Sequence, residues 1–165
     1  MLTITKSLIF LSFILAFAVA LQDGDQIAFK THGSFFNAQY QYLNGDSVHD
    51  TLGMAPSTDY TSFSGTWWEA HKLSDGSFAF RSLGHLLNNP ETNIYLNGNT
   101  YTGAVDLAAS TDASGTHWAA QTLPDGTVAL KCTGSHLNPN FVYLNVDTYI
   151  GKVNLASGTG ASGSH

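Results

Sequence analysis

The chain repeats itself about every 50 residues, and this repeat constrains the fold more than any other feature. One copy contains Ser-Gly-Thr-His-Trp at 114–118, Leu-Pro-Asp-Gly at 123–126 and Tyr-Leu-Asn at 143–145. The preceding copy has the same order at 64–68, 73–76 and 95–97, and a worn first copy ends with Tyr-Leu-Asn at 42–44. The corresponding alanines are Ala28, Ala79 and Ala129, so the period is 51 and then 50 residues. Self-similarity at a fixed period predicts one structural unit used three times.

Residues 1–20 have the features of a targeting segment. Lys6 supplies a basic start, an apolar run follows from Leu8 to Phe17, and Ala18-Val19-Ala20 forms a small-x-small cleavage site. The apolar run is shorter than the roughly 20 residues that cross a bilayer. We therefore expect a secretory signal peptide at 1–20, and a mature chain (21–165) that is extracellular and not inserted into a membrane.

Charge and cysteine content limit the classes of partner and the means of stabilisation. Residues 21–165 hold five Lys/Arg and twelve Asp/Glu, a net charge of −7 with histidine neutral, and the acidic residues are scattered. This balance disfavours nucleic acid and anionic lipid surfaces as partners. The lone Cys132 excludes an internal disulfide framework. We expect it to be a small buried residue on the face of Val128 and Leu130.

The segments between turn signals alternate with period two, which is typical of β-strands. Asp-Gly at 75–76 and 125–126 predicts hairpin turns, and so does Asn-Gly at 44–45 and 97–98. Each copy then reads as four short strands, and residues 21–165 lack a sustained helical pattern. An all-β chain with such even spacing is expected to form a sandwich or a barrel.

Three copies of four strands at this period resemble the β-trefoil superfamily, in its fascin-like and ricin-B-like forms. The resemblance rests on the repeat, on Trp68 and Trp118, and on the three Tyr-Leu-Asn triplets. It implies one β-trefoil domain at 21–165 with pseudo-threefold symmetry and repeats at about 21–66, 67–116 and 117–165. At matching places in a repeat, the two tryptophans are expected to be core anchors.

The twelfth strand of that pattern falls at the C-terminal end of the printed sequence. Residues 162–165 (Ser-Gly-Ser-His) begin a third Ser-Gly-Thr-like unit, and the corresponding tryptophan would be residue 166. We therefore expect eleven strands of twelve, with the last strand missing. Either a native continuation supplies it, or a neighbouring chain fills the open edge by strand addition.

Catalytic and metal-binding patterns are weak. His85 and His136 fall in corresponding loops and His32 lies close to the corresponding place, but the three lack the spacing of a metal site. Glu69 and Glu91 are the only glutamates, and the Asp-Gly aspartates suit turn capping. We expect a protein that is not an enzyme and that has no cofactor and no metal.

The turns after each Tyr-Leu repeat a combination of amide, carboxylate and aromatic side chains. Such groups can hydrogen-bond sugar hydroxyls and stack on sugar rings; the alternative is that they are turn residues and nothing more. Trp67 lies one residue off the repeat, beside Trp68, and is expected on the opposite face, where it is a candidate exposed aromatic. The candidate ligand-binding residues are Asn97, Asn99, Tyr101, Asn145, Asp147, Tyr149, Asn44, Asp46 and Trp67.

These observations favour a secreted binding module whose partners are glycans or a glycosylated surface. Up to three weak related sites would gain avidity on a multivalent surface. One alternative is a β-trefoil protease inhibitor, with the unrepeated loop Met54 to Ser64 as the inhibitory segment. Another is a structural, self-assembling extracellular protein.

Overall fold

The computed structural model describes residues 21–32, 37–46, 51–84, 94–134 and 138–160. The predicted signal peptide, the terminal residues 162–165, and His85 and His136 lie outside these ranges. The described residues form eleven strands and two short 3-10 turns, so the all-β prediction is confirmed. The strands are β1 (Gln26–Ile27), β2 (Tyr42–Asp46), β3 (Thr51–Ala55), β4 (Trp68–Lys72), β5 (Phe78–Ser82), β6 (Tyr95–Gly98), β7 (Val105–Ala108), β8 (Trp118–Thr122), β9 (Val128–Cys132), β10 (Tyr143–Asp147) and β11 (Lys152–Ala156).

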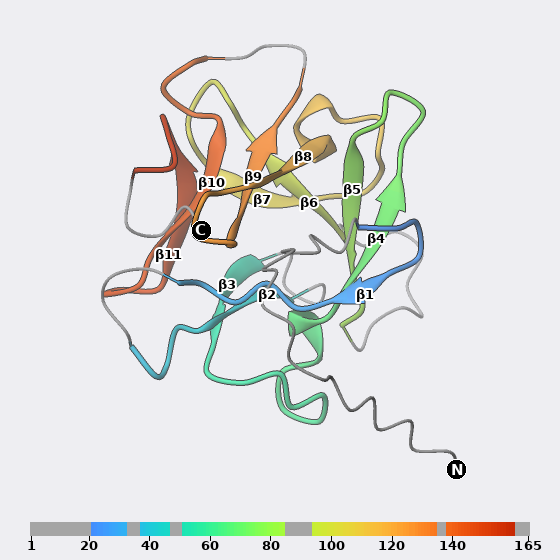
Figure 1. Ribbon diagram of the computed structural model, residues 1–165. Coiled ribbons are helices and arrows are strands. Elements are labelled where there is room, and N and C mark those ends of the chain that lie inside the picture. Colours follow the sequence, from blue (N-terminus) through green and yellow to red (C-terminus); the bar gives the residue numbers. More distant parts are fainter. Residues whose placement is uncertain (1–20, 33–36, 47–50, 85–93, 135–137, 161–165) are drawn as a thin grey trace, which may run out of the picture.

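The strands form two antiparallel sheets. The larger sheet has the order β1-β4-β5-β8-β9-β10-β11, with β6 paired to β5 and β7 paired to β6. The smaller sheet is the hairpin of β2 and β3, which lies beside the segment that continues from β1 (Figure 1). Hairpins from distant parts of the chain therefore surround a common interior.

Two hairpins, β4–β5 and β8–β9, have the same register and the same turn. Trp68 lies opposite Ser82 in the first hairpin, and Trp118 lies opposite Cys132 in the second. Gly76 and Gly126 have φ of 86° and 85°, a conformation that glycine adopts without steric cost. The aspartate before each glycine accepts a hydrogen bond from the backbone N–H two residues on, at 2.9 Å. The Asp-Gly turn prediction is confirmed.

Three further hairpins, β2–β3, β6–β7 and β10–β11, also share a register. In each one the tyrosine of Tyr-Leu-Asn lies opposite an alanine, namely Ala55, Ala108 and Ala156. The predicted turns at Asn44-Gly45 and Asn97-Gly98 are wrong, because both pairs lie inside strands β2 and β6. The chain reverses direction later, after Gly98 in the β6–β7 hairpin.

The tryptophans explain why glycine stands inside these strands. Trp68 and Trp118 are fully buried, and their indole N–H groups donate to the carbonyl oxygens of Leu43 (3.2 Å) and Leu96 (2.9 Å). A Cβ atom at Gly45 would lie 2.8 Å from Cη2 of Trp68. A Cβ atom at Gly98 would lie 3.0 Å from Cη2 of Trp118. The core-anchor prediction is confirmed, and the two glycines leave room for the rings.

The Ser-Gly-Thr units form the 3-10 turns η1 (Ser64–Thr66) and η2 (Ser114–Thr116), which lead into β4 and β8. Thr66 and Thr116 are fully buried, and each hydroxyl donates to the carbonyl three residues earlier at 2.7 Å. The buried hydroxyls are thus satisfied locally. Sequence periodicity did not predict these turns.

The predicted core face of β9 is only partly correct. Cys132 is fully buried and Leu130 is 5% exposed, as expected, but Val128 is 49% exposed. Phe78, which corresponds to Val128, lies opposite Trp118 and is half-buried. Val128 lies opposite Thr122 of β8, but no described strand pairs with it on its other side, where Phe78 has Trp118.

Candidate functional site

The tip of the β6–β7 hairpin displays Tyr101 on a turn held by side-chain hydrogen bonds. Asn99 Oδ1 accepts from the backbone N–H groups of Tyr101 and Thr102, both at 3.0 Å. The N–H of Gly103 donates to the carbonyl of Asn99 at 2.8 Å, with Gly103 at φ 78°. The Tyr101 side chain is 82% exposed on this ordered turn.

The β10–β11 tip has the same design. Asp147 Oδ1 accepts from the N–H of Tyr149 at 2.9 Å, and the N–H of Gly151 donates to the carbonyl of Asp147 at 2.8 Å. Tyr149 is 79% exposed and Ile150 is 56% exposed. The residues predicted to act together, Asn99 with Tyr101 and Asp147 with Tyr149, do lie in the same turn. In each turn the polar side chain accepts a backbone hydrogen bond and thereby stabilises the turn.

The predicted amides Asn97 and Asn145 lie further back, in strands β6 and β10. Asn97 Nδ2 donates to Asp106 Oδ1 at 2.6 Å, and Asn145 Nδ2 donates to Asn154 Oδ1 at 2.7 Å. Both asparagines are half-buried. Their amides form cross-strand bonds, which stabilise the hairpins that carry the tyrosines.

In the first copy, Asn44 and Asp46 are half-buried residues of strand β2. Asn44 lies opposite Gly53, and Asp46 lies opposite Thr51. Residues 47–50, where the first copy would have its counterpart of Tyr101 and Tyr149, lie outside the described residues.

Trp67 is half-buried and faces away from the core that encloses Trp68. Its indole N–H donates to the carbonyl of Thr58 at 3.0 Å, and its ring lines a shallow cleft with Tyr60 and Leu83. The corresponding His117 places Nε2 3.1 Å from the carbonyl of Thr111. Both residues therefore anchor the preceding loop. Tyr60 is 47% exposed. The sequence analysis included it only as part of the unrepeated loop Met54 to Ser64, and did not predict that it lies beside Trp67.

Asp75, in the β4–β5 turn, and Cys132, in the core, both have shifted pKa values. Ser77 lowers the pKa of Asp75 to about 2 by donating its side-chain and backbone hydrogen bonds, and contact with His117 lowers it further. Burial raises the pKa of the Cys132 thiol, whose Sγ lies 3.7 Å from the carbonyl oxygen of Gly115. Such a thiol is a poor nucleophile.

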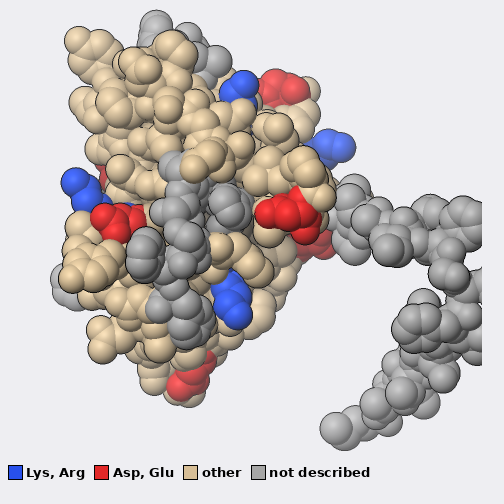
Figure 2. Space-filling model, turned by 60° about the vertical axis from the view of Figure 1, so that its left-hand side comes forward, with Lys and Arg blue, Asp and Glu red and all other residues tan. Residues whose placement is uncertain are grey.

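Charged side chains are dispersed on the surface. Figure 2 shows Lys/Arg and Asp/Glu scattered over one face, without a block of one charge. Within the part of the chain that the structure describes, no group of three His, Cys, Asp or Glu residues is arranged for a metal ion. The same residues contain no helix long and apolar enough to cross a bilayer.

The sequence matches no known family model, and no curated protein is significantly similar to it.

Proposed function

We propose that the protein is a secreted, non-catalytic carbohydrate-binding module with a β-trefoil fold. Two observations support the fold: the shared register of β4–β5 and β8–β9, and the shared register of the three remaining hairpins. Secretion is inferred from the signal-like residues 1–20.

The observation that carries the binding function is the pair of tyrosines at the hairpin tips. Tyr101 and Tyr149 occupy corresponding turns and are 82% and 79% exposed. Large exposed aromatic rings on ordered turns lose little conformational entropy when a ligand stacks on them. Their phenol groups add a hydrogen-bonding handle, and this combination suits the apolar face and hydroxyl rim of a sugar. The partners would be glycans on a multivalent surface.

A glycan array followed by titration of the best glycan tests this function. Tyr101→Ala and Tyr149→Ala should each weaken binding to a glycan surface several-fold, since an aromatic contact is worth about 1 kcal/mol. The double variant should lose more than either single variant, because two sites share the surface. Tyr60→Ala is the matched control and should bind normally. An array without hits at high protein concentration, or full binding by the double variant, would contradict the proposal.

Protease inhibition remains a second candidate, because the loop between β3 and η1 is pre-organised. Asp59 Oδ1 accepts from the N–H and the hydroxyl of Thr61 (3.1 and 2.9 Å), and Oδ2 accepts from Ser62 at 3.2 Å. The Thr61 hydroxyl bond is also the main cause that lowers the pKa of Asp59. An ordered loop avoids part of the entropic cost of binding. Inhibition of serine or cysteine proteases, abolished by Tyr60→Ala, would favour this function over the first.

A further inference from the structure

Each copy of the repeat places a cation directly opposite the tyrosine of Tyr-Leu-Asn. Arg81 lies opposite Tyr95, and Lys131 lies opposite Tyr143. All four of these side chains are half-buried, and Lys131 Nζ is 6.0 Å from the centroid of the Tyr143 ring. Residues 21–165 contain only five Lys and Arg residues, and three of them occupy this place. The cation is therefore part of the repeat.

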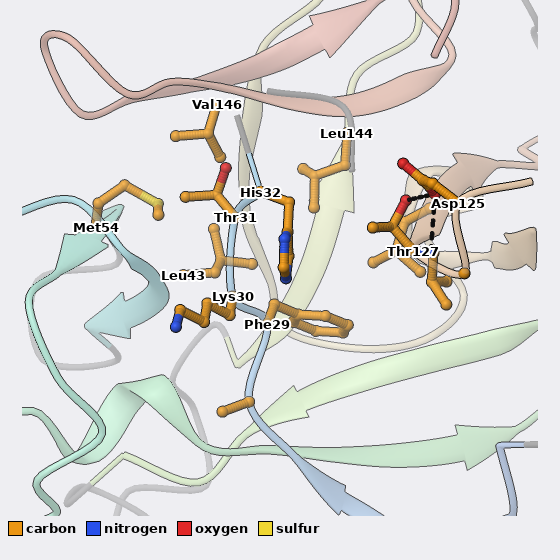
Figure 3. Close-up of a pocket in the computed structure, with 14 residues that line it drawn as sticks. Phe29, Lys30, Thr31, His32, Leu43, Met54, Asp125, Thr127, Leu144 and Val146 are labelled. Atoms are coloured by element: carbon orange, nitrogen blue, oxygen red, sulfur yellow. Dashed lines mark hydrogen bonds between the residues drawn. The ribbon is translucent and has the colours of Figure 1, made fainter. Parts of the chain in front are cut away.

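The first copy has the same pair in different surroundings. Lys30 forms an antiparallel bridge with Tyr42, and its Nζ is 5.8 Å from the centroid of the tyrosine ring. Lys30 also lines an apolar groove of about 480 Å³, together with Phe29 and Leu144 (Figure 3). The cations of the other two copies instead lie in β5 and β9, the middle strands of the segments β4-β5-β6 and β8-β9-β10. The registers of these two segments correspond.

In the second copy a carboxylate of the chain itself lies beside the cation. Glu69 is opposite Arg81, and its Oε2 is 3.3 Å from Arg81 Nη1. The same oxygen is 3.1 Å from Nε2 of His71, which lies two residues further along β4. The His71 ring in turn contacts the Tyr95 ring, with 6.1 Å between the centroids. One carboxylate therefore lies close to two nitrogen groups, next to a tyrosine.

The third copy keeps two nitrogen groups and lacks the carboxylate. The residue opposite Lys131 is Ala119, which corresponds to Glu69, and Gln121 stands where the second copy has its histidine. The Tyr143 hydroxyl donates to Gln121 Oε1 at 3.2 Å, which leaves the Nε2 donor of that amide available. Within the described part of the chain, Lys131 has no ion pair. Both nitrogen groups therefore lie beside Tyr143, next to the small side chain of Ala119.

The charges around this place define the class of ligand. Lys131 supplies one positive charge and Gln121 can donate from Nε2, and these two donors suit one carboxylate. The second copy shows the same arrangement filled by a carboxylate, that of Glu69. The net charge of −7 over residues 21–165 opposes polyanions such as nucleic acid or heavily sulfated polysaccharides. A ligand with a single carboxylate is therefore favoured.

We propose that Ala119, Gln121 and Lys131 form a second binding site, which takes the carboxylate of an acidic sugar. The carboxylate occupies the place that the Glu69 side chain fills in the second copy, and it accepts hydrogen bonds from Lys131 Nζ and Gln121 Nε2. The choice of a sugar rests on the proposed carbohydrate-binding function, whereas the preference for a carboxylate rests on the comparison of the two copies. The site lies at the start of β10, away from the hairpin tips.

NMR titration of the purified protein with small glycosides tests the site. The probes are the methyl glycosides of glucuronic, galacturonic and N-acetylneuraminic acid, and methyl glucoside is the uncharged control. At least one acidic probe should saturably shift the amide signals of Ala119 and Lys131, whereas methyl glucoside should leave these signals unchanged. Lys131→Met keeps the aliphatic stem but removes the charge, and should weaken binding roughly fivefold or more. The matched control Lys152→Met, in β11, should bind normally.

The second copy supplies a reciprocal test. Ala119→Glu should close the site, because the new carboxylate would pair with Lys131 as Glu69 pairs with Arg81. Glu69→Ala should open a corresponding site in the second copy, seen as new saturable shifts at Arg81. The two variants exchange the properties of the two copies, so they test the proposal even if Lys131→Met perturbs folding.

The outcomes separate this proposal from the function assigned to the hairpin tips. Failure of all three acidic probes to bind, or undiminished binding by both Lys131→Met and Ala119→Glu, would overturn the second site and leave the hairpin-tip function standing. Binding of propionate as tight as that of the acidic glycosides would overturn the assignment to a sugar. The double variant Tyr101→Ala/Tyr149→Ala should bind the acidic probe normally. Loss of that binding in the double variant would place the carboxylate at the hairpin tips and contradict the proposal.

Discussion

Gly45 shows how one residue position joins a hairpin to the next part of the chain. It lies in β2 between Asn44 and Asp46, and the edge of the Trp68 ring occupies the space where a side chain would be. The same strand supplies the Leu43 carbonyl that accepts the Trp68 indole N–H. A methyl group at position 45 would meet both the indole and Ser82.

We therefore expect Gly45→Ala to lower the free energy of unfolding by about 1–3 kcal/mol, through overpacking. Gly53→Ala is the matched control, because Gly53 lies across from Asn44 and a Cβ atom there would have no neighbour within 4 Å. It should be neutral or stabilise by up to about 1 kcal/mol, through the unfolded state. Denaturant titration measures both. Equal costs for the two variants would contradict the packing role of Gly45.

For single residues, the sequence correctly predicted burial where the repeat supplies a matching position. It did not predict the role of residues whose environment depends on distant parts of the chain. Trp68 and Trp118 could be assigned to the core from their matching places in the repeat, and Cys132 from the alternation of its strand. Asn-Gly at 44–45 instead looked like a turn, because local propensity carries no information about an indole 23 residues further on. The exposure of Val128 was missed for a related reason: strand alternation gives a face, but burial also depends on the neighbouring strand.

At the level of secondary-structure elements, a side-chain contact joins the turn between β4 and β5 to His117, the residue before β8. Asp75 Oδ2 lies 2.8 Å from Nδ1 of His117, while Asp75 Oδ1 accepts the bonds of the Ser77 hydroxyl and backbone N–H. These contacts favour the ionised carboxylate in the folded state and lower its pKa from 3.8 to about 2. A single side chain thus joins two successive hairpins.

This pairing predicts acid sensitivity with a definite sign. Because the folded pKa is depressed, the stabilisation by Asp75 is complete above pH 3.8 and is lost as the pH falls towards 2. The Asp75→Asn variant should therefore lose less stability than the native protein between about pH 4 and pH 2. Ser77→Ala removes the largest cause of the depression and should behave between the two. Thermal unfolding across this pH range measures the difference, and parallel curves for all three proteins would exclude the contribution.

Element types were more predictable than element ends. Asp-Gly at 75–76 and 125–126 correctly marked two hairpins, because glycine at positive φ is a local requirement. The 3-10 turns of Ser64–Thr66 and Ser114–Thr116 escaped prediction, since they depend on a glycine packed against the preceding hairpin. The candidate site had the same limit: exposure of Tyr101 and Tyr149 was inferred, but the cross-strand role of Asn97 was not.

For the whole molecule, Cys132 reports on opening of the interior. It is fully buried, and burial raises the pKa of its thiol, so a reagent can reach the thiolate after the surrounding strands separate. Labelling with a disulfide reagent in native buffer should be roughly a thousandfold or more slower than in denaturant. Val128→Cys in a Cys132→Ala background is the control on the same strand and should label rapidly. Fast labelling of native Cys132 would mean that the interior opens locally.

The two indole hydrogen bonds also have a consequence for biosynthesis. Trp68 donates to a carbonyl 25 residues earlier, and Trp118 donates to one 22 residues earlier. In both cases the receiving strand leaves the ribosome before the ring that it binds. Nascent chains can fold progressively from the N-terminus. During translation, each tryptophan ring can therefore pack against a strand that has already been synthesised.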